Sequence, residues 1–340
     1  MRSKSLLIAT IATGLSCSKP SAEPDAGGPL SLGRQTATDS SPSAEDRAGP
    51  VGADASQADW PSATVSVLDE GRKPRRRLRY VWRIDQHEEL TMNLQTVAST
   101  ENPDADATGV ALPPVRIVLA IDPSGVSPEG DMHFAWRVAS SHVKADPGIA
   151  SQLADGMRTE VAAIEHLAGT AVVTSRGLVQ SIVIDPKSAS LGESSGQMVE
   201  QVRQTLRGVA VPFPEEEVGL GARWQKLSEL SSKDALITQS DTFALRSLAA
   251  TRGSVDDVLA QTAPPQPLKT PGAPEEGQAR MESMLASGTA RMTFDLERLV
   301  AQAKIESTTT MVVSRPSRGD GSRRMTMILR VEISLTGSAH

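Results

Sequence analysis

Residues 194–224 of the 340-residue chain read SSGQMVEQVRQTLRGVAVPFPEEEVGLGARW, and this stretch decides the fold. Met198, Val202 and Leu206 recur every four residues, which places them on one face of an amphipathic helix. Gly208 follows at a position where a left-handed residue ends many helices. The stretch therefore begins with a helix whose apolar face needs a partner surface.

The predicted helix is followed by an extended strip held by prolines. Pro212 and Pro214 fix φ and remove two amide donors, so Phe213 stands between them on a non-helical segment. Trp224 begins the next apolar run. We expect a helix laid on a sheet, with Phe213 and Trp224 plugging the edge of that sheet. The alternative is a contact with a ligand or partner, for which the candidates are Phe213, Trp224, Trp136 and Trp82.

The sequence on both sides of this stretch alternates between apolar and polar residues, which is the period of a β-strand with one apolar face. Predicted single strands cover residues 78–84, 90–94, 115–121, 132–138, 224–230, 236–249, 255–262 and 279–296. Hairpins are predicted at 170–185, turning at Arg176 and Gly177, and at 305–335. Residues 100–113 and the proline-rich insertion at 263–277 are predicted as loops.

A second helix is expected between these strands. Asp146 and Pro147 are a typical helix start, apolar residues follow at helical spacing, and Gly169 is expected to end the helix. Residues 296–303 are a candidate for a short third helix. Strands in hairpins with two amphipathic helices predict an α+β fold. We expect one domain, residues 77–336, in which both helices pack on a curved antiparallel sheet.

The N-terminus has the features of an export signal. Arg2 and Lys4 precede a short apolar run at residues 6–15, and residues 1–16 are interpreted as a signal peptide. Cys17 is the only cysteine, so it has no partner for an intramolecular disulfide. Residues 17–76 are rich in Ser, Ala, Pro and Gly and are predicted to be a disordered tether.

The position of Cys17 resembles that of the acylated cysteine of bacterial lipoproteins. Ser16 fits the lipobox, although Leu15 and Gly14 are displaced from the usual pattern. The resemblance implies a lipid anchor in the membrane, and Ser18 in place of an aspartate implies the outer membrane. The alternative is cleavage by the ordinary signal peptidase, which leaves an incidental thiol.

A basic run, GRKPRRRLR at residues 71–79, stands at the predicted start of the domain. Such a run can contact an anionic membrane surface or an acidic partner. The interpretation that we favour is a solvated segment leading into an edge strand. The net charge of −6 and the nine aromatic residues argue against a nucleic-acid partner.

No catalytic or metal-binding motif stands out in the sequence. His87, His133, His142 and His166 have no metal-ligand spacing, and no G-x-S-x-G motif occurs. Glu215 to Glu217 and the pair Asp256 and Asp257 are interpreted as solvated carboxylates, and Arg318-Gly319-Asp320 as a turn. We therefore expect no enzymatic activity, no cofactor and no metal.

Three short motifs carry a resemblance over residues 77–336. They are LRYVWRID at the start, VPFPEEEVGLGARW after the central helix, and a late G-x-x-R-M-x-F-D-L strand at residues 288–296. With them the chain resembles uncharacterised lipoproteins and secreted proteins of bacterial envelopes. The expected architecture is also similar to the half-barrels of lipoprotein carriers.

Two functions are compatible with these features. The first is a lipid-anchored, non-catalytic envelope protein with a structural or interaction role, which meets an envelope protein through loops or edge strands. The second is a module that binds a lipid or a lipoprotein acyl group in an apolar cavity between sheet and helices. It is motivated by inward-facing methionines, whose side chains adapt to irregular apolar shapes: Met92, Met132, Met198, Met292, Met325 and Met327.

Overall fold

The computed structural model describes residues 63–102, 105–144, 151–186, 188, 196–232, 235–268, 279–316 and 322–339. The predictions about the signal peptide, Cys17 and most of the tether lie outside these residues. The same holds for Asp146, Pro147 and the Arg318-Gly319-Asp320 tripeptide.

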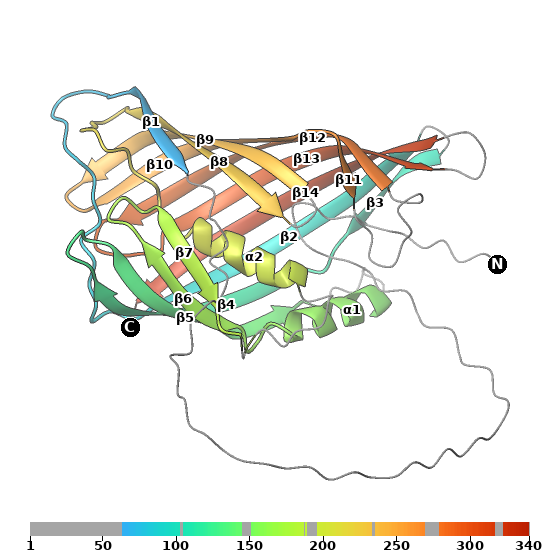
Figure 1. The fold of residues 1–340 in the computed structure, drawn as a ribbon, viewed down its shortest axis with the longest axis horizontal. Helices are drawn as coiled ribbons and strands as arrows, with labels where there is room; N and C mark the ends of the chain where they lie inside the picture. Colours follow the sequence, from blue (N-terminus) through green and yellow to red (C-terminus); the bar gives the residue numbers. More distant parts are fainter. Residues whose placement is uncertain are drawn as a thin grey trace, which may run out of the picture.

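Strands dominate the described chain (Figure 1). In chain order they are β1 (Thr64–Asp69), β2 (Glu88–Asn102), β3 (Ala105–Ala111), β4 (Val115–Val126), β5 (Met132–Val143), β6 (Ala168–Val173), β7 (Val179–Ile184), β8 (Arg223–Ser232), β9 (Ala235–Ala249), β10 (Arg252–Ala263), β11 (Gln266–Leu268), β12 (Ala279–Asp295), β13 (Gln302–Pro316) and β14 (Ser322–Ala339). The two helices are α1 (Ser151–Ala162) and α2 (Gly196–Arg207).

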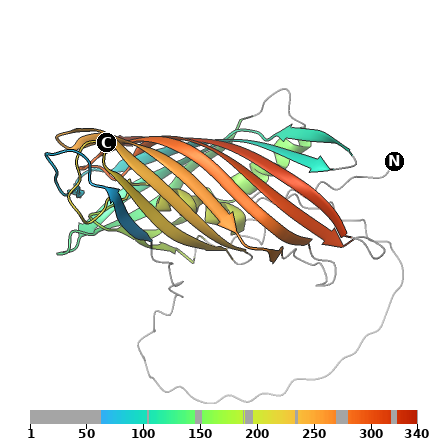
Figure 2. The ribbon, with the colours of Figure 1, turned by 90° about the horizontal axis from the view of Figure 1, so that it is seen from above.

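All strands belong to one antiparallel sheet that stays open. Its order is β1-β8-β9-β10-β12-β13-β14-β2-β4-β5-β6-β7, with β3 beside β2 and β11 beside β12. β14, the last of the described strands, therefore lies between β13 and β2. The sheet curls along its length (Figure 2). The predicted α+β fold, a curved antiparallel sheet with two helices, is confirmed.

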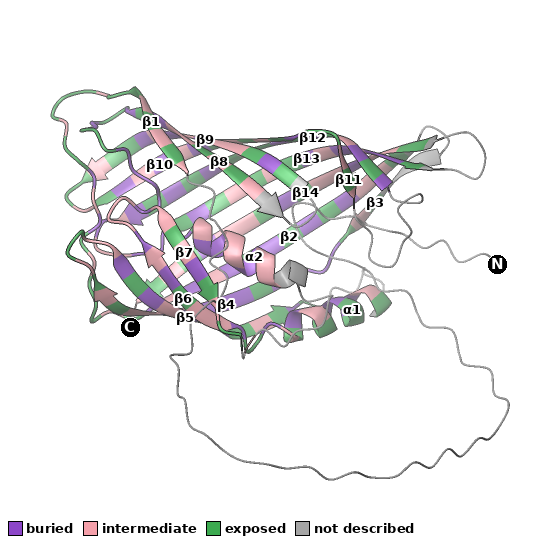
Figure 3. Ribbon diagram, in the orientation of Figure 1, coloured by how far each residue is buried: buried purple, intermediate pink, exposed green. Residues whose placement is uncertain are grey.

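The core lies on one face of the curled sheet, which we call the inner face. Buried and exposed residues alternate along the strands, as the banding in Figure 3 shows. α2 buries Val202 and Leu206 in this core and contacts β7. α1 buries Met157 and Val161 and packs against β5, where the Ser141 hydroxyl donates to the Val161 carbonyl over 2.9 Å. The apolar face of each helix thus finds the partner surface that it needs.

The inner face carries two separate apolar clusters. The main core includes residues of both helices and of most strands. The second, which we call the methionine cluster, lies toward the other end of β9–β14. Its buried residues are Ile237, Ala263, Ala279, Met281, Met284, Ala286, Met311, Val313 and Met327, with Leu230, Leu268 and Met325 packed against them. Among the described residues, no helix side chain belongs to this cluster.

The start of the folded part is earlier than predicted. β1 lies inside the segment predicted as tether, and it pairs with β8. Residues 70–76 are also docked, because Gly219 N–H donates to the Glu70 carbonyl and Arg76 forms a bridge with Val218. The boundary at residue 76 is therefore wrong. This region is mostly polar, so the short alternation of apolar and polar residues in TVSVLD was not interpreted as a strand.

The predicted strand at residues 78–84 is wrong as well. Leu78 and Tyr80 are buried and Arg79 between them is half-buried, but the segment has no continuous strand partner. The Tyr80 N–H donates to Ser175 and the Val81 N–H donates to Leu296, which belong to different parts of the chain. An extended segment wedged between two loops gives the same period as a strand.

Several loop and helix boundaries also differ from the predictions. Residues 100–113 contain the end of β2 and all of β3. Residues 296–301 form turns and irregular structure rather than a helix, and residues 302–303 already belong to β13. Gly169 does not end α1 but lies in β6. A Cβ there would collide with the Val183 carbonyl oxygen and crowd the Trp136 ring, so glycine permits the close packing. Gly208 follows α2 as predicted, but its φ lies outside the left-handed region.

Candidate functional site

Three of the four predicted contact residues lie in an aromatic row that fills the core. Trp82 stacks on Tyr80 with ring centroids 4.5 Å apart, and Tyr80 lies 5.3 Å from Phe213. Phe213 in turn lies 5.0 Å from Phe294 and 6.2 Å from Trp224. Phe213 and Trp224 are fully buried, so neither side chain is accessible to a ligand or partner in this conformation. The row therefore contributes to the packing of the main core.

Polar atoms of the row are bonded to the extended strip. Trp224 Nε1 donates to the Pro212 carbonyl at 2.8 Å, and the Val211 N–H donates to the Tyr80 hydroxyl at 3.0 Å. Burial raises the pKa of Tyr80 well above its usual range. Trp82 is half-buried, and its Nε1 donates to the Gly130 carbonyl at 3.0 Å. Since these donors are satisfied, the row is a structural element.

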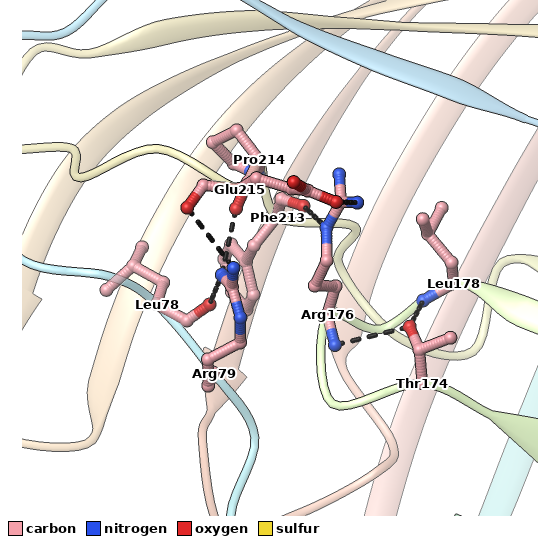
Figure 4. Close-up of polar contacts among 8 residues, drawn as sticks. All are labelled: Leu78, Arg79, Thr174, Arg176, Leu178, Phe213, Pro214 and Glu215. Atoms are coloured by element: carbon pink, nitrogen blue, oxygen red, sulfur yellow. Dashed lines mark hydrogen bonds and ion pairs between the residues drawn. The ribbon is translucent and has the colours of Figure 1, made fainter. Parts of the chain in front are cut away.

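The basic run also holds this strip in place (Figure 4). The Arg79 guanidinium donates to the carbonyls of Leu78, Pro214 and Glu215. Arg176 donates to the Phe213 carbonyl at 2.9 Å and pairs with the Glu215 carboxylate at 2.8 Å. Burial and the nearby Arg176 lower the pKa of Arg79. At least this part of the basic run is therefore structural, and it does not lead into a strand.

The fourth predicted contact residue, Trp136, lies apart from the row. Its side chain is 2% exposed, and its Nε1 has no hydrogen-bond partner. It lines an open surface pocket of about 430 Å³ between β5, β6 and β7, together with Gly169, Thr170 and Val183. A second pocket of about 340 Å³ has a polar lining that includes Arg83, Arg252 and Asp295. No methionine lines either pocket.

A polar cluster interrupts the inner face between the main core and the methionine cluster. It comprises Lys226 on β8, Gln239 and Asp241 on β9, and Asp257 and Gln261 on β10. Each of these three strands passes from the main core through the polar cluster to the methionine cluster. β9, for example, places Phe243 in the main core, then Asp241 and Gln239 in the polar cluster, then Ile237 in the methionine cluster. The polar cluster therefore lies on the core side of the sheet.

Most of the polar cluster is held together by hydrogen bonds. Lys226 Nζ lies 3.1 Å from Asp241 Oδ2, and the Asp241 side chain is 4% exposed. Gln239 Nε2 donates to both Asp241 carboxylate oxygens at 2.9 Å, and Gln261 Nε2 donates to Gln239 Oε1 at 2.9 Å. A buried ion pair of this kind needs such additional bonds to offset desolvation.

Asp257 takes no part in these side-chain hydrogen bonds. It is 8% exposed, and its Oδ1 is buried without a hydrogen-bond partner. Burial and the negative charge of Asp241 raise the pKa of Asp257 to about 8, although Lys226 and backbone hydrogen bonds from Val258 and Thr242 act in the opposite direction. Asp257 is therefore a neutral acid at neutral pH. A second unpartnered and buried oxygen, Thr96 Oγ1 on β2, faces the same side of the sheet.

Sequence reasoning missed this site. Asp257 was interpreted as a solvated carboxylate beside Asp256, and only Asp256 fits that description, because it pairs with Arg246 and Arg291 on the outer face. The signal was present in the alternation of Val255, Asp257 and Leu259, which puts Asp257 in phase with the core. The partners on β8 and β9 could not be foreseen, since strand pairing was unknown.

The histidines and acidic residues form no cluster of metal-ligand type in the part of the chain that is described. No group of three or more His, Cys, Asp or Glu side chains there is arranged to hold a metal ion. His87 pairs with Asp122 at 2.7 Å, but both side chains are exposed. Glu88 is buried and accepts hydrogen bonds from the Leu299 and Val300 N–H groups, which ties β2 to the turn after β12.

Neither helix among the described residues has the length and apolar character needed to cross a membrane. No protein-family model matches the sequence. A comparison with curated proteins gives no match either. The side chains on the inner face of the sheet are therefore the basis for a functional proposal.

Proposed function

We propose that the protein is a lipid-anchored, non-catalytic binding protein of the bacterial cell envelope, which accommodates an apolar ligand group on the inner face of its sheet. The ligand class is a lipid or a lipoprotein acyl group. The observation that carries the proposal is the methionine cluster, an apolar patch that is separate from the main core and includes no described helix side chain.

The composition of the cluster suits a ligand of variable shape. Met281, Met284, Met311 and Met327 are buried there, and Met325 is half-buried at its margin. Methionine is unbranched and polarisable, so its side chain adapts to irregular apolar surfaces. A core that needed only stability would favour branched side chains with defined rotamers. The main core, in contrast, buries Met92 and Met132 among aromatic and branched residues.

The open sheet gives such a ligand a route to the inner face. β1 and β7 are the two ends of the sheet order and do not pair with each other. Leu230, Leu268 and Met325 at the margin of the methionine cluster are half-buried, so its edge is within reach of solvent. Burying a ligand chain there is favourable by about 0.8 kcal/mol per CH₂ group.

Binding of the neutral apolar dye Nile red tests the proposal. We expect fluorescence enhancement and a blue shift with the full-length Cys17→Ser protein, and at least about fivefold weaker binding for Met311→Ser. Leu285→Ser is the matched control, because Leu285 lies on the outer face of β12 and is 60% exposed. Urea unfolding identifies any variant that has lost its fold. Equal dye binding by folded wild type, Met311→Ser and Leu285→Ser contradicts the proposal.

The lipid anchor needs a separate test. We expect intact mass spectrometry of membrane-purified protein to show a mature N-terminus at Cys17 with the added mass of a diacyl or triacyl group. The Cys17→Ser variant is expected to lack that mass and to leave the membrane fraction. Wild-type protein without an acyl group, recovered in the soluble fraction, rules out the anchor.

A further inference from the structure

The polar cluster has more hydrogen-bond acceptors than its own donors satisfy. Lys226 and the two glutamine amides direct their donors at Asp241 and at Gln239. Asp257 Oδ1 receives none of them, and it is shielded from water. A buried oxygen without a partner costs roughly 1–3 kcal/mol. The site therefore has an unused acceptor that a ligand donor can satisfy.

The charge around Asp257 favours a cationic donor. Asp241 on β9 and Lys226 on β8 are the charged groups whose interaction with Asp257 is resolved. On the other side of Asp257, the paired residues are Ala290 on β12 and then Ile305 on β13, which carry no charge. The single ammonium of Lys226 already contacts Asp241. Two carboxyl groups thus share one cation, and a second cation would allow both to ionise.

The position of the polar cluster relative to the methionine cluster indicates the chemistry of the part of the ligand beyond its head group. Asp241 and Ile237 of the methionine cluster lie on the same face of β9 and are four residues apart, about 13 Å along the strand. A molecule with its positive head at Asp257 can therefore lay an apolar chain on the methionine cluster. Lys226, Gln239 and Gln261 are half-buried, so the polar cluster is within reach of solvent.

We propose that the inner face binds an amphipathic amine, with the ammonium group at the carboxyl pair Asp257 and Asp241 and the apolar chain against the methionine cluster. This inference rests on the proposed function, because it uses the same apolar surface, and it adds the chemistry of the head group. The ammonium donates to Asp257 Oδ1 and supplies the missing positive charge.

Ion pairing at Asp257 requires loss of its proton. Because the pKa of Asp257 is raised to about 8, most of the carboxyl groups are protonated at pH 7. Binding of an ammonium therefore releases close to one proton to the buffer. This release distinguishes an ion pair at Asp257 from apolar binding alone.

Three probes with the same chain separate the inference from the proposed function. They are decylammonium, decanol and decanoate, each titrated calorimetrically below its micelle concentration into the full-length Cys17→Ser protein. We expect decylammonium to bind at least about tenfold more tightly than decanol, and decanoate to bind more weakly than decanol. Propylammonium is expected to bind more weakly than decylammonium because it lacks the chain. Titration in phosphate and in Tris, whose ionisation enthalpies differ, measures the released proton.

Asp257→Asn is the decisive variant, and Asp256→Asn is its matched control on the outer face of the same strand. Asp257→Asn is expected to remove the preference for decylammonium and the proton release, with decanol binding unchanged. Equal affinity for all three probes, or a preference that survives in Asp257→Asn, overturns the inference and leaves apolar binding intact. Equal binding of propylammonium and decylammonium also overturns it. Failure of every probe to bind overturns the proposed function as well.

Discussion

Replacing Asp257 by Asn is expected to stabilise the protein, and the gain should grow as the pH rises from about 4 to about 8. In the folded protein the pKa of Asp257 is raised to about 8. Between about pH 4 and pH 8, this carboxyl group therefore ionises mainly in the unfolded wild-type chain. The free energy of unfolding of wild type therefore falls relative to that of the variant between about pH 4 and about pH 8. Above about pH 8 the difference stays constant. Asn mimics the neutral acid at every pH.

The expected gain for Asp257→Asn at pH 8 is on the order of 4 kcal/mol, from a shift of about four pKa units reduced for structural relaxation. Urea unfolding of both proteins at pH 5 and pH 8 measures it. Asp256→Asn serves as the control, because hydrogen bonds from Arg246 and Arg291 lower the pKa of Asp256 even though desolvation opposes them. That variant should show no gain at pH 8. An equal difference between wild type and Asp257→Asn at both pH values contradicts a raised pKa.

Removing the Phe213 ring is expected to cause the largest loss of stability of any substitution considered. Phe213 is fully buried, and its ring lies between those of Tyr80, Phe294 and Trp224. Phe213→Ala leaves a cavity at the centre of the aromatic row, and such changes cost about 3–5 kcal/mol. We expect the urea midpoint to fall accordingly, with the slope of the transition unchanged.

Leu285→Ala provides the comparison for Phe213→Ala. Leu285 is apolar too, but it is 60% exposed on the outer face of β12, so its truncation should change the free energy of unfolding by no more than about 0.5 kcal/mol. If Phe213→Ala destabilised the protein no more than Leu285→Ala does, the aromatic row would not be the structural element that its burial indicates.

Periodicity in the sequence was enough to predict both helices and most strands of the sheet, but not β1, β3 or β11. The alternation from Met325 to Leu335 became β14, and the four-residue spacing of Val202 and Leu206 became the buried face of α2. Periodicity failed where hydrogen bonding decides the structure. Leu78 and Tyr80 alternate as in a strand, but their segment bonds to two separate loops. Local sequence contains no information about which groups lie across from a segment.

The candidate site shows the same limit. The phase of Asp257 relative to Val255 was visible in the sequence, yet its meaning depends on Asp241 and Lys226, which reach it only through the pairing of β8, β9 and β10. The aromatic residues were visible as well, and their composition alone could not separate a plug from a contact surface. Burial indicates a packing role, because Phe213, Trp224 and Trp136 are all enclosed in the main core, although Trp136 also borders a surface pocket.

The place of β14 in the sheet has a consequence for how the chain folds. One group of strands comes from residues 64–69 and 223–316, and the other comes from residues 88–184. Among the described strands, β14 alone pairs with members of both groups. Most of the chain separates β2 from β14, so their contact requires closure of a very long loop and forms slowly. Until these last 18 residues of strand are in place, the hydrogen-bonded sheet exists as two halves with two extra unpaired edges. Among the described strands, β14 is thus the one that joins the two halves into a single sheet.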